Sequence, residues 1–144
     1  MTTALVDFPP RERLKLAGEL IASLPQSDLT LRHYFADGVY GREGDLPAGT
    51  VFAGRVHHKS QINIVSRGAV AVLTETGVIE MRAPFTMVSP PGAQRAAYVL
   101  EDATWTTLIA CDEVDPDVIF SKYTSPSFEE FKAARDEILN IIQG

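Results

Sequence analysis

The side chains best suited to chemistry lie in GRVHHKSQINI, residues 54–64, and at the end of SPPGAQR, residues 89–95. Arg55 and His57 are two residues apart, so they share one face if this segment is a strand, whereas His58 faces the other side. Guanidinium groups such as those of Arg55 and Arg95 bind carboxylate or phosphate. An imidazole can act as a general base near neutral pH. These residue types therefore indicate anion binding or proton transfer.

Other residues with reactive side chains are weaker candidates for a functional site. Cys111 is the only cysteine, which excludes a disulfide within the chain and a cysteine-based zinc cluster; we expect it to be a small buried residue at a strand end. His33 is expected to pack or to stabilise a turn. A short acidic run lacks the turn glycine and the ligand spacing of a calcium loop, and it is interpreted as a solvated linker: Asp112, Glu113, Asp115 and Asp117.

The composition limits the classes of protein to consider. With 144 residues, 45% hydrophobic and 22% charged, the chain suits one globular domain spanning residues 1–144. A net charge of -6 and the lack of a basic run make nucleic-acid binding an unfavourable hypothesis. No signal peptide and no apolar stretch long enough for a membrane span are visible, so we expect a cytoplasmic protein that has no membrane partner.

The elements that must position these residues form three zones. Residues 1–31 contain an amphipathic helix, RERLKLAGELIASL, and a lead-in. Residues 32–112 read as short strands separated by turns, among them SRG (66–68) and EDA (101–103), which predicts an antiparallel barrel or sandwich. Residues 113–144 are predicted to hold a linker and a C-terminal helix with a capping box at Ser127 and Glu130. The apolar stripe of that helix packs on the barrel or on a partner subunit.

The middle zone resembles the cupin family in two segments. GTVFAGRVHHKSQINIVSRG has the family's spacing from Gly49 to Gly68. Its two first histidine positions hold Arg55 and His57, and its glutamate position holds Gln61. In the second segment, Pro90 and Gly92 match, Arg95 stands at the third histidine position, and Pro84 and Val99 replace the family's glycine and asparagine. The resemblance covers roughly residues 46–110 and implies a cupin-like antiparallel β-barrel or jelly roll with flanking helices.

The longer string from Gly54 to Leu108 is similar to small single-domain cupin proteins, of the RmlC-like jelly-roll kind, that are common in bacteriophage genomes. This resemblance implies a phage setting, as a virion component or accessory protein in the virion or the host cytoplasm. A virion or host protein would then be a partner. The C-terminal stripe in turn suggests a homo-oligomer, most simply a dimer.

The substitutions change what a cupin pocket can do. Metal-dependent cupins hold a transition metal with three imidazoles and a carboxylate, but an arginine has no free lone pair and stays charged. We therefore expect no metal and no cofactor. The resemblance places His57 inside the barrel, and it then predicts a ligand-binding set suited to a small anion: Arg55, His57, Gln61, Asn63, Arg95 and Tyr98. An alternative is that Arg55 and Arg95 form structural ion pairs with Glu75, Glu80 or Glu101.

The sequence therefore favours a non-catalytic binding or structural protein with a degenerate metal site. One alternative is an isomerase or epimerase that acts on a small anionic substrate with His57 as general base. Another is a protein that sequesters an anion or a nucleotide through Arg55, His57 and Arg95. The sequence offers no acidic partner for His57, and no pair of nucleophile and base at a recognisable spacing.

Overall fold

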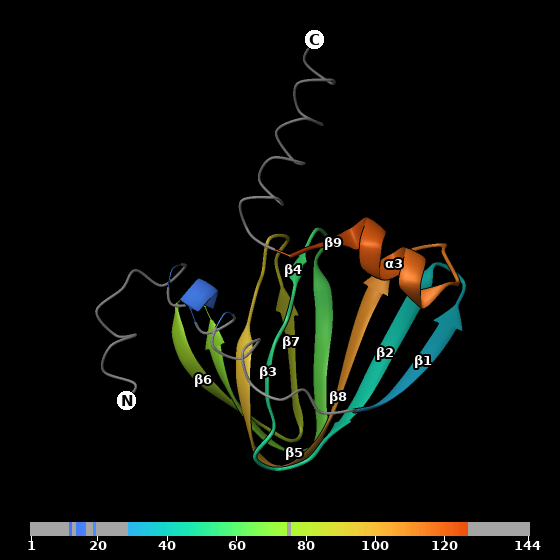
Figure 1. Cartoon of the computed structure of the whole chain (residues 1–144). Coiled ribbons are helices and arrows are strands. Elements are labelled where there is room, and N and C mark those ends of the chain that lie inside the picture. The colour runs from blue at the N-terminus through green and yellow to red at the C-terminus, as the bar shows by residue number, and fades with distance from the viewer. Residues whose placement is uncertain (1–11, 13, 17–18, 20–28, 75, 127–144) are drawn as a thin grey trace.

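The described part of the chain is built mainly from antiparallel strands that curl into a barrel (Figure 1). The computed structural model describes residues 12, 14–16, 19, 29–74 and 76–126. Within these residues the elements are β1 (Thr30–Ala36), β2 (Val39–Leu46), β3 (Val51–Ala53), β4 (Val56–His57), β5 (Gln61–Thr74), β6 (Gly77–Arg82), β7 (Phe85–Ser89), β8 (Ala96–Ala110), α3 (Pro116–Tyr123) and β9 (Thr124–Ser125). The prediction of a mainly β, antiparallel fold is confirmed.

Two long strands, β5 and β8, run side by side through the barrel and organise the others. The first half of β5 pairs with β7 and the second half with β6. Likewise, β8 pairs with β3 near its start and with β2 near its end. Each long strand is therefore shared between two walls, so that one seven-stranded sheet folds over to form both of them.

The turns expected at SRG (66–68) and EDA (101–103) are not present, because both segments lie inside the long strands. The pairing of β5 with β8 instead shifts register between Val65 and Arg67, again before Ala69, and once more before Val70. Gly68 sits at these irregularities with φ +75°. Such bulges bend a strand without ending it, so turn-forming residues here mark a bend in the barrel wall.

The core fills the closed end of the barrel with alternating inward side chains. Its buried members come from β2, β5, β6 and β8: Leu46, Val65, Val70, Val72, Met81, Ala97, Val99 and Ala103. Within the predicted N-terminal helix, residues 12, 14–16 and 19 are helical. Leu14 is buried, with 1% of its surface exposed, and packs with Ala96 and Leu73. The rest of that helix and the whole predicted C-terminal helix lie outside the described residues.

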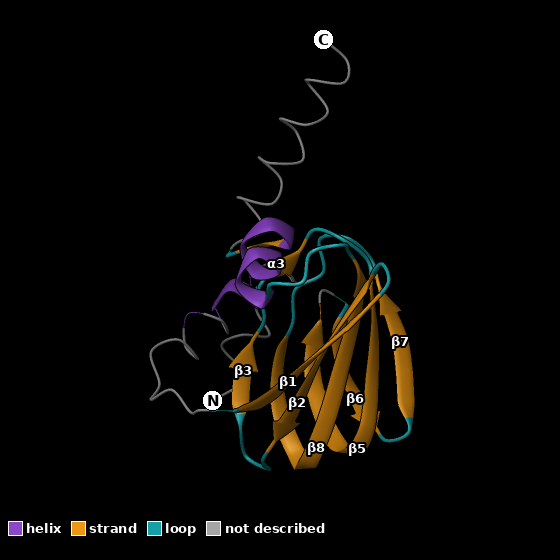
Figure 2. Cartoon of the chain, turned by 90° about the vertical axis from the view of Figure 1, so that its right-hand side faces the viewer, coloured by secondary structure: helices purple, strands orange, loops and turns teal. Residues whose placement is uncertain are grey.

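The stretch expected to be a linker contains helix α3, which lies across one end of the barrel (Figures 1 and 2). Asp115 caps it by accepting a hydrogen bond from the Asp117 backbone N–H, and Pro116 starts the first turn. Glu113 accepts hydrogen bonds from Lys122 and from the Tyr123 hydroxyl, and these bonds lower its pKa to about 2. The acidic run therefore builds a helix start instead of a solvated linker.

A two-stranded sheet ties α3 to the barrel. β4 pairs with β9, which follows α3 directly, so that His57 lies opposite Thr124. On the other face of β4, His58 Nε2 lies 2.6 Å from Ser125 Oγ. None of the helices in the described residues is long and apolar enough to span a bilayer. The dimer stays a prediction, because the stripe on which it depends is not among the described residues.

Candidate functional site

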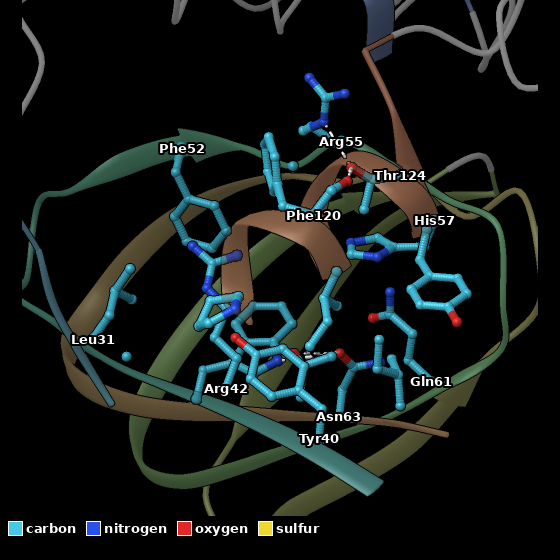
Figure 3. Close-up of a pocket in the computed structure, with 18 of the residues that line it drawn as sticks. Leu31, Tyr40, Arg42, Phe52, Arg55, His57, Gln61, Asn63, Phe120 and Thr124 are labelled. Atoms are coloured by element: carbon cyan, nitrogen blue, oxygen red, sulfur yellow. Dashed lines mark hydrogen bonds between the residues drawn. The ribbon is translucent and has the colours of Figure 1, made fainter. Parts of the chain in front are cut away.

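A cavity of about 580 Å³ lies inside the barrel beneath α3 (Figure 3). Its walls come from the inward faces of β1, β2, β5 and β8, from the segment running through β3 and β4, and from α3. This volume is in the range of small-molecule binding sites. The cavity lies between the core and α3. Apolar residues of the core therefore form its floor, and the helix covers its upper part.

The inward side chains of β2 and β8 form rows across the sheet. Arg42 pairs with Thr107, which pairs with Asn63 of β5. One step toward the core, Gly44 pairs with Trp105, which pairs with Val65. Rows two residues apart on a strand are about 7 Å apart, so a polar row stands directly above an apolar row.

Asn63 is the centre of a satisfied polar network in the wall. It is 2% exposed and donates to Ser89 Oγ at 2.7 Å, while its Oδ1 accepts from Trp105 Nε1 at 3.3 Å and from Thr107 Oγ1 at 3.2 Å. Arg95 Nη1 also donates to Ser89 Oγ, at 3.1 Å. The network fixes the Trp105 ring and holds one edge of the Arg95 guanidinium, so this wall is rigid before any ligand arrives.

Gln61 is different from Asn63, although both line the cavity. It is 4% exposed, and its Nε2 has no hydrogen-bond partner among the residues that the structure describes. An unpaired donor in such a buried position costs about 1–3 kcal/mol. The Gln61 amide therefore offers a donor to any acceptor that enters the cavity.

Arg42 is a pocket residue that the sequence analysis missed. It lines the cavity, and its side chain forms no hydrogen bond or ion pair with the described part of the chain. A signal existed: Tyr40, Arg42, Gly44 and Leu46 alternate with residues of the other face, so an arginine follows an aromatic residue on an inward face.

Arg55 is placed differently from the expectation. Its guanidinium lies over the Phe120 ring, 4.3 Å from the centroid, and its Nε donates to Thr124 Oγ1 at 2.8 Å. Figure 3 shows it pointing away from the other side chains of the cavity. Arg55 thus belongs to the rim and holds α3 and β9, because the break between β3 and β4 ends the alternation that would have aimed it inward.

Two further expectations are corrected. Tyr98 is 49% exposed and does not line the cavity, because its neighbours Ala97 and Val99 take the buried positions on β8. The proposed structural carboxylates are engaged elsewhere: Glu80 and Glu101 both pair with Arg82 on the outer surface. Glu75 lies outside the described residues. His33, as expected, is a packing residue, stacked on Tyr40 and hydrogen-bonded to its hydroxyl.

His57 lines the cavity in a strongly positive environment. Burial lowers its pKa most, and the charges of Arg42, Arg95, His58 and Arg55 lower it further, to about 4. Among these charges, that of Arg42 lowers the pKa of His57 most and that of Arg55 least. The imidazole is therefore neutral at pH 7, and any negative group bound beside it would relieve the repulsion among its neighbours.

Solved structures with related folds were found, whereas no family model and no curated protein matches the sequence. KdgF from a Halomonas species superposes with a TM-score of 0.54 at 18% identity, over 65% of this chain and 88% of that one. The cupin domain of Schizosaccharomyces pombe Cnp3 gives 0.52 at 14%, over 64% and 67%. An acetylacetone dioxygenase from Acinetobacter johnsonii gives 0.51 at 16%, over 59% and 61%.

The fold is a cupin barrel. The expected jelly-roll class is thereby confirmed, and at these identities the likeness is one of fold alone. The cavity under α3 is the interior of this cupin barrel, where His57, Gln61, Asn63 and Arg95 meet as lining residues together with Arg42.

The cupin barrel's lining does not suit a transition metal. Its described members offer His57 and His33 as nitrogen donors and Asp117 as the one carboxylate, while three arginines add positive charge. No group of three or more histidine, cysteine, aspartate or glutamate side chains that could hold a metal occurs in the described ranges. A cation placed beside Arg42 and Arg95 would be repelled, so the donor set and the electrostatics both oppose a metal.

We expect the purified protein to carry no stoichiometric iron, manganese, nickel or zinc. Elemental analysis by mass spectrometry of protein prepared without chelators checks this. The expectation fails if about one such ion accompanies each chain and disappears in the His57→Ala variant. Loading the protein with added metal before analysis is the matched control for metal lost during purification.

Proposed function

We propose that this protein binds a small organic anion inside its cupin barrel, without a metal and without catalysis. The observation that carries the proposal is the imbalance of charge in the cavity. Its described lining holds Arg42 and Arg95, with Arg55 at the rim, against the single carboxylate of Asp117. The unpaired Nε2 of Gln61 adds a neutral donor in the same cavity.

The arginines are well suited to the role. Arg95 is held by Ser89 and lies near Met87, so it is oriented in advance. Arg42 has no hydrogen bond or ion pair with another described residue that it would lose on binding a ligand. Guanidinium groups held in this way bind carboxylate or phosphate with charge-assisted hydrogen bonds. Like charges that face one cavity favour the bound anion over the empty pocket.

Catalysis by His57 is less well supported. Its pKa of about 4 makes it a weak base at neutral pH, since the ideal catalytic pKa lies near the working pH. Among the described lining residues there is no cysteine or serine that it could activate. An isomerase or epimerase is therefore the weaker hypothesis, and binding requires only the groups already present.

The biological setting that we propose is a bacteriophage, with the protein acting as a virion component or as an accessory protein in the host cytoplasm. The support is the similarity of residues 54–108 to small phage cupin proteins. A homodimer is part of the same proposal. Ligand binding inside the barrel is compatible with either setting.

Thermal denaturation tests the proposal. We expect a panel of sodium acetate, phosphate, benzoate and 3-phenylpropanoate, compared with chloride at equal ionic strength, to contain at least one anion that raises the Tm. At ten times its Kd the rise should be about 3–5 °C. Arg42→Met should abolish the rise, and Arg95→Met should do the same. Arg82→Met, which removes a surface arginine paired with Glu80 and Glu101, should leave the rise intact.

The ligand-free variants provide the internal control. Arg42→Met should keep or slightly raise the Tm without ligand, because it removes a repulsive charge that has no hydrogen-bond partner among the described residues. Two results would reject the proposal: no anion stabilises the wild type, or the stabilisation persists in both Arg42→Met and Arg95→Met.

A further inference from the structure

We propose that the ligand is an amphipathic organic acid, with its carboxylate at Arg42, Arg95 and Gln61 and a flat apolar body against Trp105 and Phe52. This inference rests on the proposed function and names the chemical class of its ligand. It is drawn from the way in which polar and apolar groups are sorted along the cavity. Neither an inorganic anion nor a sugar phosphate uses both parts.

The sorting follows from strand register. The row of Arg42, Thr107 and Asn63 supplies polar groups, and the adjacent row toward the core places Gly44 opposite Trp105. Leu31 of β1 extends this second row, because it pairs with Gly44, and Leu46 of β2 lies one step further toward the core, so the lining here is apolar. A ligand whose carboxylate reaches the upper row therefore has an apolar surface for its body about 7 Å further in.

Trp105 lines the cavity. Its Nε1 already donates to Asn63 Oδ1, which fixes the ring, and Phe52 stands edge-on to it at 5.9 Å and 71°. The indole N–H is thus already bonded to Asn63 in the barrel wall, so the ring offers a ligand only its aromatic surface. Stacking or edge contacts with a planar ligand are favourable at such a corner.

Gly44, which pairs with Trp105, lets Leu31 and Leu46 pack closely against its backbone. Its φ is not positive, so its backbone conformation does not call for glycine. A Cβ at this position would lie 3.2 Å from Leu31 Cδ2 and 3.7 Å from Leu46 Cδ2. A methyl group here would therefore displace Leu31, which lines the cavity at the row where a flat body would lie, so Gly44 is a candidate specificity determinant.

A polyhydroxylated ligand fits this arrangement poorly. Sugar hydroxyls placed in the lower row would face Leu31, Leu46 and Phe52, where they would lose hydrogen bonds with water and gain few in return. A nucleotide would bring a ribose into the same surroundings. An aromatic or alicyclic carboxylic acid places only carbon there, so it gains from burial instead of losing.

Isothermal titration calorimetry at pH 7 with four probes tests the inference. 3-Phenylpropanoate has both parts, acetate and phosphate have the charge alone, and 3-phenylpropan-1-ol has the body alone. We expect 3-phenylpropanoate to bind at least tenfold more tightly than each of the other three, since a charge-assisted hydrogen bond and a buried ring each contribute roughly tenfold or more.

Variants assign the two parts to residues. Arg42→Met should reduce the affinity for 3-phenylpropanoate at least tenfold and leave 3-phenylpropan-1-ol unchanged. Gly44→Ala should weaken 3-phenylpropanoate severalfold and leave acetate unchanged. If acetate or phosphate binds as tightly as 3-phenylpropanoate, the inference is wrong while the proposed function survives. If no probe with a negative charge binds, the proposed function itself is wrong.

Discussion

Replacing Gly68 by alanine is expected to destabilise the barrel by roughly 3–5 kcal/mol, one of the largest effects of any single substitution in the chain. Gly68 has φ +75°, and a Cβ there would lie 2.0 Å from the carbonyl oxygen of Asp102 and 2.8 Å from the Cα of Ala103. Both contacts are with backbone of β8, the strand paired with β5. Relief of the clash requires the two long strands to separate where their register shifts.

Gly49→Ala is the matched control, because Gly49 also has a left-handed φ, +87°, but nothing lies within 4 Å of the added Cβ. It should cost only about 1–2 kcal/mol, the penalty of the backbone conformation. Urea denaturation followed by circular dichroism measures both variants. Equal losses in the two would show that the close approach at Asp102 does not determine the stability of the bend.

Stability should fall by about 2 kcal/mol between pH 7 and pH 5 because of His57. Its pKa is about 4 in the folded protein, against an ordinary value near 6.5, because burial and the nearby arginines disfavour the charged ring. In this window the unfolded chain binds more protons than the folded one, so stability is fully present above pH 6.5. It is lost progressively as the pH falls toward 4.

The carboxylates do not mask this window. The pKa values of Asp45 and Glu113 are lowered to about 2 by their hydrogen bonds to Arg32 and Lys122, so their contribution is lost only as the pH falls below about 4.5. Urea midpoints at pH 7, 6 and 5 give the slope. His57→Gln should remove most of it and His58→Gln a smaller part, since His58 is also shifted downward. A slope that is unchanged in His57→Gln would contradict the placement of this imidazole.

The sequence predicted the class of the fold well, because the strands of a barrel wall show alternating apolar and polar residues and are bounded by turn-forming residues. Val70 and Val72 on β5, and Val99 on β8, are core residues on strands that were expected. The error at SRG has a local cause, the glycine at position 68. A glycine that allows a bulge inside a strand and a glycine that allows a turn give the same one-residue signal.

The site was predicted less completely, and the reasons are tertiary. Gln61 and Asn63 line the cavity because the alternation of β5 aims them inward, and His57 and Arg95 line it beside them. Arg55 lies at the rim because its guanidinium packs on the Phe120 ring of α3 and donates to the Thr124 hydroxyl of β9. Helix α3 lay in a stretch that was interpreted as a linker. Arg42 became a pocket residue only through the pairing of β2 with β8, which links positions 65 residues apart.

The fluorescence of Trp105 tests the central account most directly, because Trp105 is the only tryptophan of the chain and lines the cavity. We predict that 3-phenylpropanoate, added to protein freed of metal with EDTA, changes this emission along a saturable curve with one site per chain. The change should be lost in Arg42→Met and retained in Arg82→Met. A flat titration, or one that appears only after a transition metal is restored, would contradict a metal-independent anion pocket.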